Sequence, residues 1–222
     1  MPRPTAVVFD LGGVLVDWNP RYLFRQLLPD DATVEWFLAE VCTAEWNAAQ
    51  DAGRTWEEAV AEASARFPDQ AEFVTAYHER WGDMIAGQLD QTVGVLADLR
   101  AMGVGLFALT NWSAEKFDQT VQRFEWLSWF DGIVVSGREH VVKPDPEIYR
   151  VLLERHRLEP ARTVYIDDVL VNVEAARALG MISLHFVGAD RLRADLRNTG
   201  VPIRMIDGRE VDRGHPAGPA VR

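Results

Sequence analysis

The chain has 222 residues, enough for one large core or for a core with a small accessory domain. Its 48% hydrophobic and 26% charged residues are typical of a globular protein that folds in water. The net charge of -11 argues against sequence-independent nucleic-acid binding, which needs basic surface to neutralise phosphates. The single cysteine, Cys42, excludes an intramolecular disulfide.

The sequence was inspected for targeting and membrane-spanning segments. We see no signal peptide before the first apolar segment and no stretch of membrane-spanning length. We therefore expect a cytoplasmic protein that binds neither nucleic acid nor a membrane. The sequence leaves its oligomeric state open between monomer and dimer.

Short apolar segments alternate with helical patterns along most of the chain. Strands are predicted at residues 6–9, 105–109, 132–135, 163–166, 183–187 and 203–206. Helices are predicted at residues 92–102, 113–124, 146–157 and 171–179. This alternation predicts an α/β fold, a Rossmann-like parallel sheet sandwiched by helices.

The segment from residue 17 to residue 85 interrupts this rhythm. It contains no convincing strand and at least four helical segments, one of which begins with the capping box Thr55-x-x-Glu58. We therefore expect a core formed by residues 1–16 and 86–207, with an inserted all-helical cap at 17–85. Residues 208–222 are polar and rich in Gly and Pro, and we expect them to form a disordered tail.

Five of the eight tryptophans fall in or beside the insert, namely Trp18, Trp36, Trp46, Trp56 and Trp81. A small helical unit needs large side chains to build a core, so we expect most of them to pack inside it. One or two of them are candidates to line a pocket that faces the rest of the protein.

Polar side chains follow four of the predicted strands. In open parallel sheets, ligands bind beyond the carboxyl ends of the strands, so these residues can converge although they are distant in sequence. They are Asp10, Thr110 with Asn111, Lys143, and Asp167 with Asp168. Any one of them alone could be a helix cap or a solvated turn residue, but four in this order point to one site.

The residue types indicate a chemistry. Clustered carboxylates suit Mg²⁺, and a cation allows one carboxylate to attack a phosphate that would otherwise repel it. Asp10 can then act as a covalent nucleophile. Lys143 offers a positive charge to phosphate oxygens, and Thr110 offers a hydroxyl and backbone N–H groups where the next helix begins.

The ordered motifs resemble those of the haloacid dehalogenase-like (HAD) hydrolases. The matching stretches are Phe9-Asp10-x-Gly12-Gly13-Val14-Leu15, Leu109-Thr110-Asn111, Lys143-Pro144-Asp145-Pro146 and Ile166-Asp167-Asp168 with Asn172. The resemblance spans the chain to about residue 206, and the insert is similar to the mobile cap of that family.

By this resemblance, Asp10 is the nucleophile and a Mg²⁺ ligand, and Thr110 and Lys143 bind the phosphate. Asp168 ligates Mg²⁺ with Asp167 beside it, and the carbonyl of Gly12 completes the protein ligands. Two further residues are candidates for binding substrate. Asn111 follows Thr110 directly, and Trp112 either forms a substrate platform or packs under the following helix.

Gly12 departs from the family pattern. Phosphatases of the family usually carry Asp at this position as general acid, and general acid–base catalysis contributes typically ~10²–10⁴-fold. Three explanations remain open. The substrate has a good leaving group, such as an anomeric sugar phosphate; another group or a water reached through the cap replaces the acid; or the reaction is not phosphoryl transfer. The Asp-x-Gly-Gly form resembles the α-glucose-1-phosphate phosphatase-like branch, which favours the first explanation. Asp17 near the cap hinge is a conceivable substitute, although we expect it to make structural hydrogen bonds.

The sequence thus predicts a Mg²⁺-dependent hydrolase. The favoured activity is that of a phosphatase acting on a small phosphorylated metabolite, such as a sugar phosphate, through an aspartyl-phosphate on Asp10. One alternative is a 2-haloacid dehalogenase, but that branch carries an aromatic residue at position 12 and Ser-Asn in place of Asp167-Asp168. Another is a non-catalytic binding module that lost the acid at Gly12.

Overall fold

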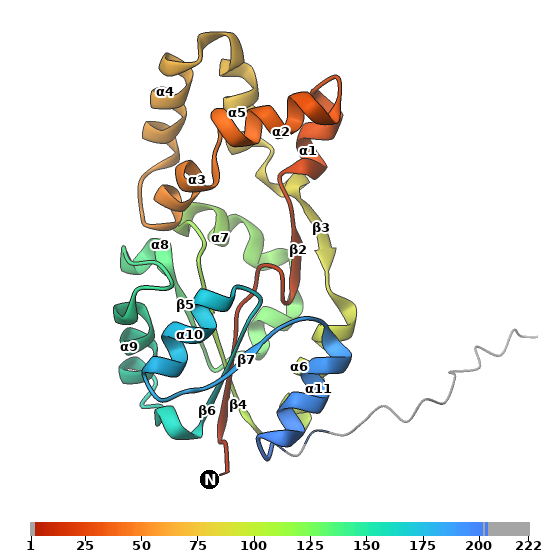
Figure 1. Cartoon of the computed structure of the whole chain (residues 1–222), viewed down its shortest axis with the longest axis vertical. Coiled ribbons are helices and arrows are strands. Elements are labelled where there is room, and N and C mark those ends of the chain that lie inside the picture. The colour runs from red at the N-terminus through yellow and green to blue at the C-terminus, as the bar shows by residue number, and fades with distance from the viewer. Residues whose placement is uncertain (1–2, 202, 204–222) are drawn as a thin grey trace, which may run out of the picture.

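A five-stranded parallel sheet lies below the inserted helices, in the lower half of the view in Figure 1, in a computed structural model that describes residues 3–201 and 203. The strand order is β5-β4-β1-β6-β7. The strands are β1 (Ala6–Phe9), β4 (Gly105–Thr110), β5 (Gly132–Val135), β6 (Thr163–Asp167) and β7 (Ile182–His185). The predicted α/β sheet is confirmed, with β1 in the middle, so that the residue after β1 lies at the centre of the carboxyl edge.

Helices cover both faces of the sheet. The helices outside the insert are α6 (Asp90–Ala101), α7 (Ala114–Thr120), α8 (Ser136–Glu139), α9 (Pro146–Arg155), α10 (Leu170–Ala178) and α11 (Ala189–Asn198). Val7 belongs to a hydrophobic cluster that includes Leu96 of α6 and Leu192 of α11. Val8 belongs to the other cluster, with residues of α9 and α10. Successive side chains of a strand point to opposite faces, so an uninterrupted apolar β1 is what a two-sided core requires.

The insert forms a layer of helices above the carboxyl edge of the sheet (Figure 1). Its helices are α1 (Arg21–Leu27), α2 (Asp31–Glu40), α3 (Ala44–Asp51), α4 (Trp56–Arg66) and α5 (Ala71–Glu79). Short 3₁₀ helices occur at Pro68–Gln70, Trp81–Met84, Val121–Arg123, Glu125–Trp129 and Pro160–Arg162. The predicted capping box starts α4, where Glu58 N donates to Thr55 Oγ1 at 3.3 Å.

Aromatic side chains build the interior of the cap, as expected for most of its tryptophans. Trp56 is fully buried, stacks on Tyr77 with ring centroids 5.9 Å apart, and meets Trp46 and Trp81 edge to face. Trp36 is 46% exposed and stands outside this cluster.

The insert is not wholly helical, which corrects the prediction that residues 17–85 contain no strand. Its two ends pair as an antiparallel ribbon of β2 (Val16–Trp18) and β3 (Ile85–Gln88). Both strands are too short and too polar to show a strand pattern, and each is stabilised by the other. Asp17 lies on this ribbon and accepts a hydrogen bond from Tyr22 Oη at 2.9 Å, the structural role expected of it.

The end of the chain is only partly described. Residues 204–206 of the last predicted strand and the predicted disordered tail at 208–222 lie outside the described residues. Among the helices of the described part, none has the length and apolar character needed to span a membrane.

Candidate active site

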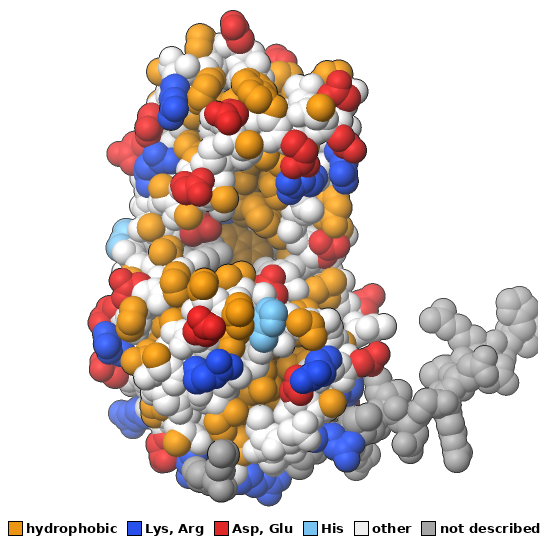
Figure 2. Space-filling model, in the orientation of Figure 1, with side chains coloured by type: hydrophobic (Ala, Val, Ile, Leu, Met, Phe, Trp, Pro, Cys, Tyr) orange, Lys and Arg blue, Asp and Glu red, His pale blue; other side chains and the backbone are white. Residues whose placement is uncertain are grey.

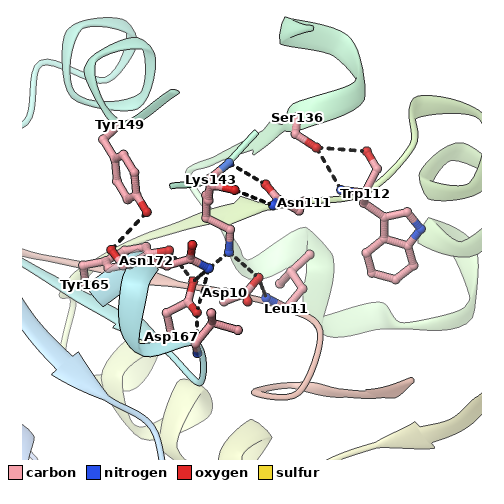
Figure 3. A network of polar contacts seen from close by, with 11 residues as sticks. Asp10, Leu11, Asn111, Trp112, Ser136, Lys143, Tyr149, Tyr165, Asp167 and Asn172 are labelled. Atoms are coloured by element: carbon pink, nitrogen blue, oxygen red, sulfur yellow. Dashed lines mark hydrogen bonds and ion pairs between the residues drawn. The ribbon is translucent and has the colours of Figure 1, made fainter. Parts of the chain in front are cut away.

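Lys143 links two acids at the carboxyl edge of the sheet (Figure 3). Its Nζ lies 2.9 Å from Asp10 Oδ1 and 2.8 Å from Asp167 Oδ2. Asp10 directly follows β1, Asp167 ends β6, and Lys143 comes from the loop between α8 and α9. All three side chains are buried. The strands therefore bring these predicted site residues together, as the sequence order suggested.

Backbone groups fix the position of Asp10. Its N–H donates to the carbonyl of Ile166 on β6 at 2.8 Å. The N–H of Leu11 donates to Asp10 Oδ1 at 2.7 Å. The carboxylate is thus held at one orientation at the end of a central strand, which is what a nucleophile needs.

Negative charge exceeds positive charge at this edge. Burial raises the pKa of Asp10 to about 7; Lys143 opposes the rise, while Asp167 and Asp168 add to it. Burial acts to lower the pKa of Lys143, but Asp10 and Asp167 outweigh it and the pKa is raised. Burial, followed by Asp167, also raises the pKa of Asp168. One ammonium therefore faces three acids, and a further cation would be stabilised here.

The donor set fits a hard divalent cation. Asp10, Asp167 and Asp168 each offer a carboxylate oxygen, and these oxygens lie within 4.8 Å of one another. Mg²⁺ prefers such oxygen ligands and keeps several waters. The Asp167 carboxylate also accepts from Val169 N at 2.8 Å and from Asn172 Nδ2 at 3.1 Å. Asp168 is exposed and lines the cavity beside Asp10, whereas Asp167 is buried and engaged by these hydrogen bonds and by Lys143, so Asp168 suits a metal ligand better than Asp167 does.

Gly13 allows Asp168 to approach. Its φ is +72°, in the left-handed region that favours glycine. A Cβ on Gly13 would lie 2.4 Å from Asp168 Oδ2, closer than real Cβ atoms come to an oxygen. The second glycine of the Gly-Gly step therefore makes room for an acid rather than for a ligand.

Asn111 clamps the loop that carries Lys143. Its Nδ2 donates to the Lys143 carbonyl at 3.0 Å, and its Oδ1 accepts from Lys143 N at 2.8 Å. The structure thus gives Asn111 a positioning contact, and its predicted contact with substrate stays a prediction. Thr110 is buried at the last position of β4.

Two adjoining cavities lie between the cap and the core, where Figure 2 shows a hollow with hydrophobic side chains. The first has a volume of about 280 Å³ and is lined by Asp10, Lys143 and Asp168, among others. The second, of about 70 Å³, is lined by Gly12, Trp18, Asn47, Asp51, Trp81, Asn111 and Trp112. Gly12, Trp18 and Asn111 line both, so the two cavities meet beside the acids.

Trp112 packs against the following helix, as one of its two expected roles requires, while its role as a substrate platform stays a prediction. It lines the smaller cavity, and its ring also packs edge to face on Phe117 of α7 with centroids 5.8 Å apart. Thr110 lines neither of these two cavities. His140, in the loop before Lys143, is exposed.

Asp51 lies at the candidate site, although the sequence did not reveal it. It ends α3 in the cap, is only 9% exposed and lines the smaller cavity. Burial raises its pKa to about 7, against the opposing effects of the Ser113 backbone N–H and of Lys143. Its sequence context, Gln50-Asp51-Ala52-Gly53, is that of an ordinary helix end, and nothing in it signals burial.

A model of the haloacid dehalogenase-like hydrolase family matches residues 4–180, a range that contains Asp10, Thr110, Lys143 and Asp168. The chain belongs to this family. The predicted superfamily is confirmed; the α-glucose-1-phosphate phosphatase-like branch stays a prediction.

Curated and solved relatives agree with this assignment. A sesquiterpene phosphatase from Aspergillus oryzae is 32% identical over 209 residues, which cover 86% of this chain and 94% of the relative. A phosphorylated carbohydrates phosphatase from Thermotoga maritima is 24% identical over 186 residues, covering 82% and 84%. An HAD family enzyme from Bacteroides thetaiotaomicron, solved as a magnesium complex, has a TM-score of 0.66 at 18% identity, covering 83% and 94%. The last of these shows that the HAD fold is shared.

Proposed function

We propose that this HAD hydrolase is a Mg²⁺-dependent phosphatase that cleaves the phosphate ester of a small organic alcohol through an aspartyl-phosphate on Asp10. The observation that carries the proposal is the cluster of Asp10, Lys143 and Asp167, in which both carboxylates lie within 2.9 Å of one buried ammonium. Two curated phosphatases among the relatives support it.

In this proposal Asp10, Asp168 and the carbonyl of Gly12 hold Mg²⁺. A bound Mg²⁺ neutralises the acids and the phosphate, so that like charges can approach. This role matches the excess of carboxylates at the site.

Nucleophilic attack, phosphate binding and positioning are assigned to individual side chains. A carboxylate oxygen of Asp10 attacks phosphorus and displaces the alcohol. Lys143 binds phosphate oxygens, and Thr110 offers its hydroxyl and neighbouring N–H groups to the same phosphate. Asp167 holds the Lys143 ammonium at 2.8 Å, and Asn111 fixes the backbone of Lys143.

The smaller cavity favours an alcohol with an apolar face. Three indole rings, of Trp18, Trp81 and Trp112, line it beside the polar Asn47 and Asp51. Indole rings contact apolar faces and offer an N–H donor at their edge. A cyclic or unsaturated hydrocarbon alcohol fits this lining, and so does a sugar ring, which has an apolar face of its own. These two classes correspond to the two phosphatase relatives.

A phosphate-release assay tests the function. Isoprenoid, sugar and simple alkyl phosphates are assayed with Mg²⁺ and with EDTA, for the wild type and for Asp10→Asn. We expect Mg²⁺-dependent release by the wild type and none by the variant. A 2-haloacid is included in the panel. Halide release without metal would favour the dehalogenase alternative, and no turnover with no Mg²⁺ binding would favour a non-catalytic module.

A further inference from the structure

The space beside Gly12 is open. A Cβ built on Gly12 would meet no atom within 4 Å. Gly12 lines both cavities, so a longer side chain at this position would project into the region where the leaving alcohol must lie. The core therefore leaves the place of a proton donor unfilled, while keeping room for one.

The cap places a carboxyl group on the same cavity. Asp51 lines the smaller cavity together with Gly12, and it comes from the C-terminal end of α3. The volume of this cavity is about 70 Å³. Asp51 and Gly12 therefore border the same small space.

The Asp51 side chain is held in place by neighbours from the cap and the core. Asn47 Nδ2 donates to Asp51 Oδ2 at 3.1 Å, and the backbone N–H of Ser113 acts to lower the pKa of the same carboxyl group. The charged group of the core that acts on it is Lys143. Burial nevertheless dominates and raises the pKa to about 7, near the value at which a group can both donate and accept a proton.

Contacts between cap and core fix the helix end that carries Asp51. Ser136 Oγ of α8 donates to the Asp51 carbonyl at 2.6 Å. Trp56 Nε1 of α4 donates to Ser113 Oγ at 2.9 Å, and both groups are buried. Asp51 thus takes up its place when the cap lies on the core.

From this geometry we infer that Asp51 of the cap is the proton donor for the leaving alcohol, in place of the acid that residue 12 lacks. The inference rests on the proposed phosphatase function. As Asp10 bonds to phosphorus, the bond from phosphorus to the ester oxygen breaks, and its electron pair stays on that oxygen. The oxygen takes the Asp51 proton and leaves as the alcohol.

The second step restores both acids. The Asp51 carboxylate takes a proton from water, whose oxygen bonds to phosphorus. The bond between phosphorus and Asp10 breaks, which releases inorganic phosphate and leaves Asp10 ionised. Asp51 is again protonated, so atoms and charge balance over the cycle. One consequence is that proton transfer requires the closed cap, so that an ester is cleaved only after the cap has covered it.

Leaving-group dependence tests the inference. Single-turnover release of the alcohol is measured with enzyme in excess and Mg²⁺ present, because this isolates the first step. The substrates are p-nitrophenyl phosphate, whose leaving group needs little proton assistance, and an alkyl phosphate that the wild type cleaves. Asp51→Asn is expected to slow alkyl phosphate cleavage by about 10²-fold or more, and p-nitrophenyl phosphate cleavage by only a few fold.

Two further variants serve as a rescue and as a control. The double variant Asp51→Asn/Gly12→Asp returns a carboxyl group to the open space and is expected to regain about tenfold or more on the alkyl phosphate. Asp69→Asn removes an exposed carboxylate between α4 and α5 and is expected to match the wild type on both esters.

Equal slowing of both esters by Asp51→Asn, or no slowing, would overturn the inference. If the variant fails to fold, wild-type rates over a series of substituted phenyl phosphates decide the matter. Weak dependence on leaving-group acidity supports a proton donor, and steep dependence contradicts it. If the wild type cleaves no phosphate ester, the proposed function itself is wrong. If the wild type is active but Asp51→Asn slows the cleavage of both esters equally, only this inference is wrong.

Discussion

Replacing Lys143 by Met should destabilise the protein in a manner that depends on pH. The ammonium lies 2.9 Å from Asp10 and 2.8 Å from Asp167, and all three groups are buried. Breaking a buried ion pair by removing one partner costs about 3–5 kcal/mol. Without the ammonium, one carboxyl group must bind a proton instead. At about 1.36 kcal/mol per pH unit, protonating a carboxyl with the ordinary pKa of 3.8 costs about 4 kcal/mol at pH 7.

The same groups determine how the stability loss of Lys143→Met changes with pH. Lys143 lowers the pKa of Asp10, so its loss raises the folded-state pKa of Asp10 further above the unfolded value. The folded state then binds more protons than the unfolded state, so stability is lost as pH rises and regained as pH falls. At pH 5 the same protonation costs only about 2 kcal/mol. Lys143→Met should therefore cost about 4 kcal/mol of unfolding free energy at pH 7 and about half of that at pH 5.

Urea unfolding of the wild type and of Lys143→Met at both pH values measures these differences. Lys116→Met is the matched control, because this buried ammonium contacts Gln119 Oε1 and lies over the Trp56 ring instead of bridging two acids. The loss of unfolding free energy in Lys116→Met should be no smaller at pH 5 than at pH 7. An equal cost of Lys143→Met at both pH values would refute the electrostatic reasoning.

The remaining predictions concern the neighbours of this cluster. Gly13→Ala must adopt a left-handed φ of +72° and press on Asp168, so it should lose at least about 1 kcal/mol of unfolding free energy and require more Mg²⁺ for activity. Gly12→Ala has open space and should change stability by less than about 0.5 kcal/mol; equal losses in urea unfolding would contradict this account. Asn111→Ala removes both side-chain hydrogen bonds to the Lys143 backbone. It should lower kcat/KM by a factor equivalent to about 1–3 kcal/mol, and an unchanged kcat/KM would contradict the positioning role of Asn111. EDTA should abolish phosphate release and added Mg²⁺ should restore it; release that persists in EDTA would exclude the metal.

The core of the fold was predictable because its signals are local. The segments at β1, β4, β5 and β6 are short and apolar. The three that lead to the site, β1, β4 and β6, end at or directly before a polar residue. The parallel topology then brings Asp10, Lys143 and Asp167 together without further information.

Features that depend on tertiary pairing were not predictable. The β2–β3 ribbon joins residues 16–18 to 85–88, and neither segment has a strand pattern of its own. Asp51 is polar and sits at an ordinary helix end, and it is buried only because the cap rests on α7 and α8. The clamp of Asn111 on Lys143 likewise follows from loop geometry that no spacing reveals.

Rapid acid quenching during the first turnover, followed by peptide mass spectrometry, tests the central claim most directly. The account predicts a phosphoryl group on Asp10 that forms with Mg²⁺ present, decays as inorganic phosphate appears, and is absent in Asp10→Asn. A phosphoryl group on another residue, or phosphate release by Asp10→Asn at the wild-type rate, would contradict it.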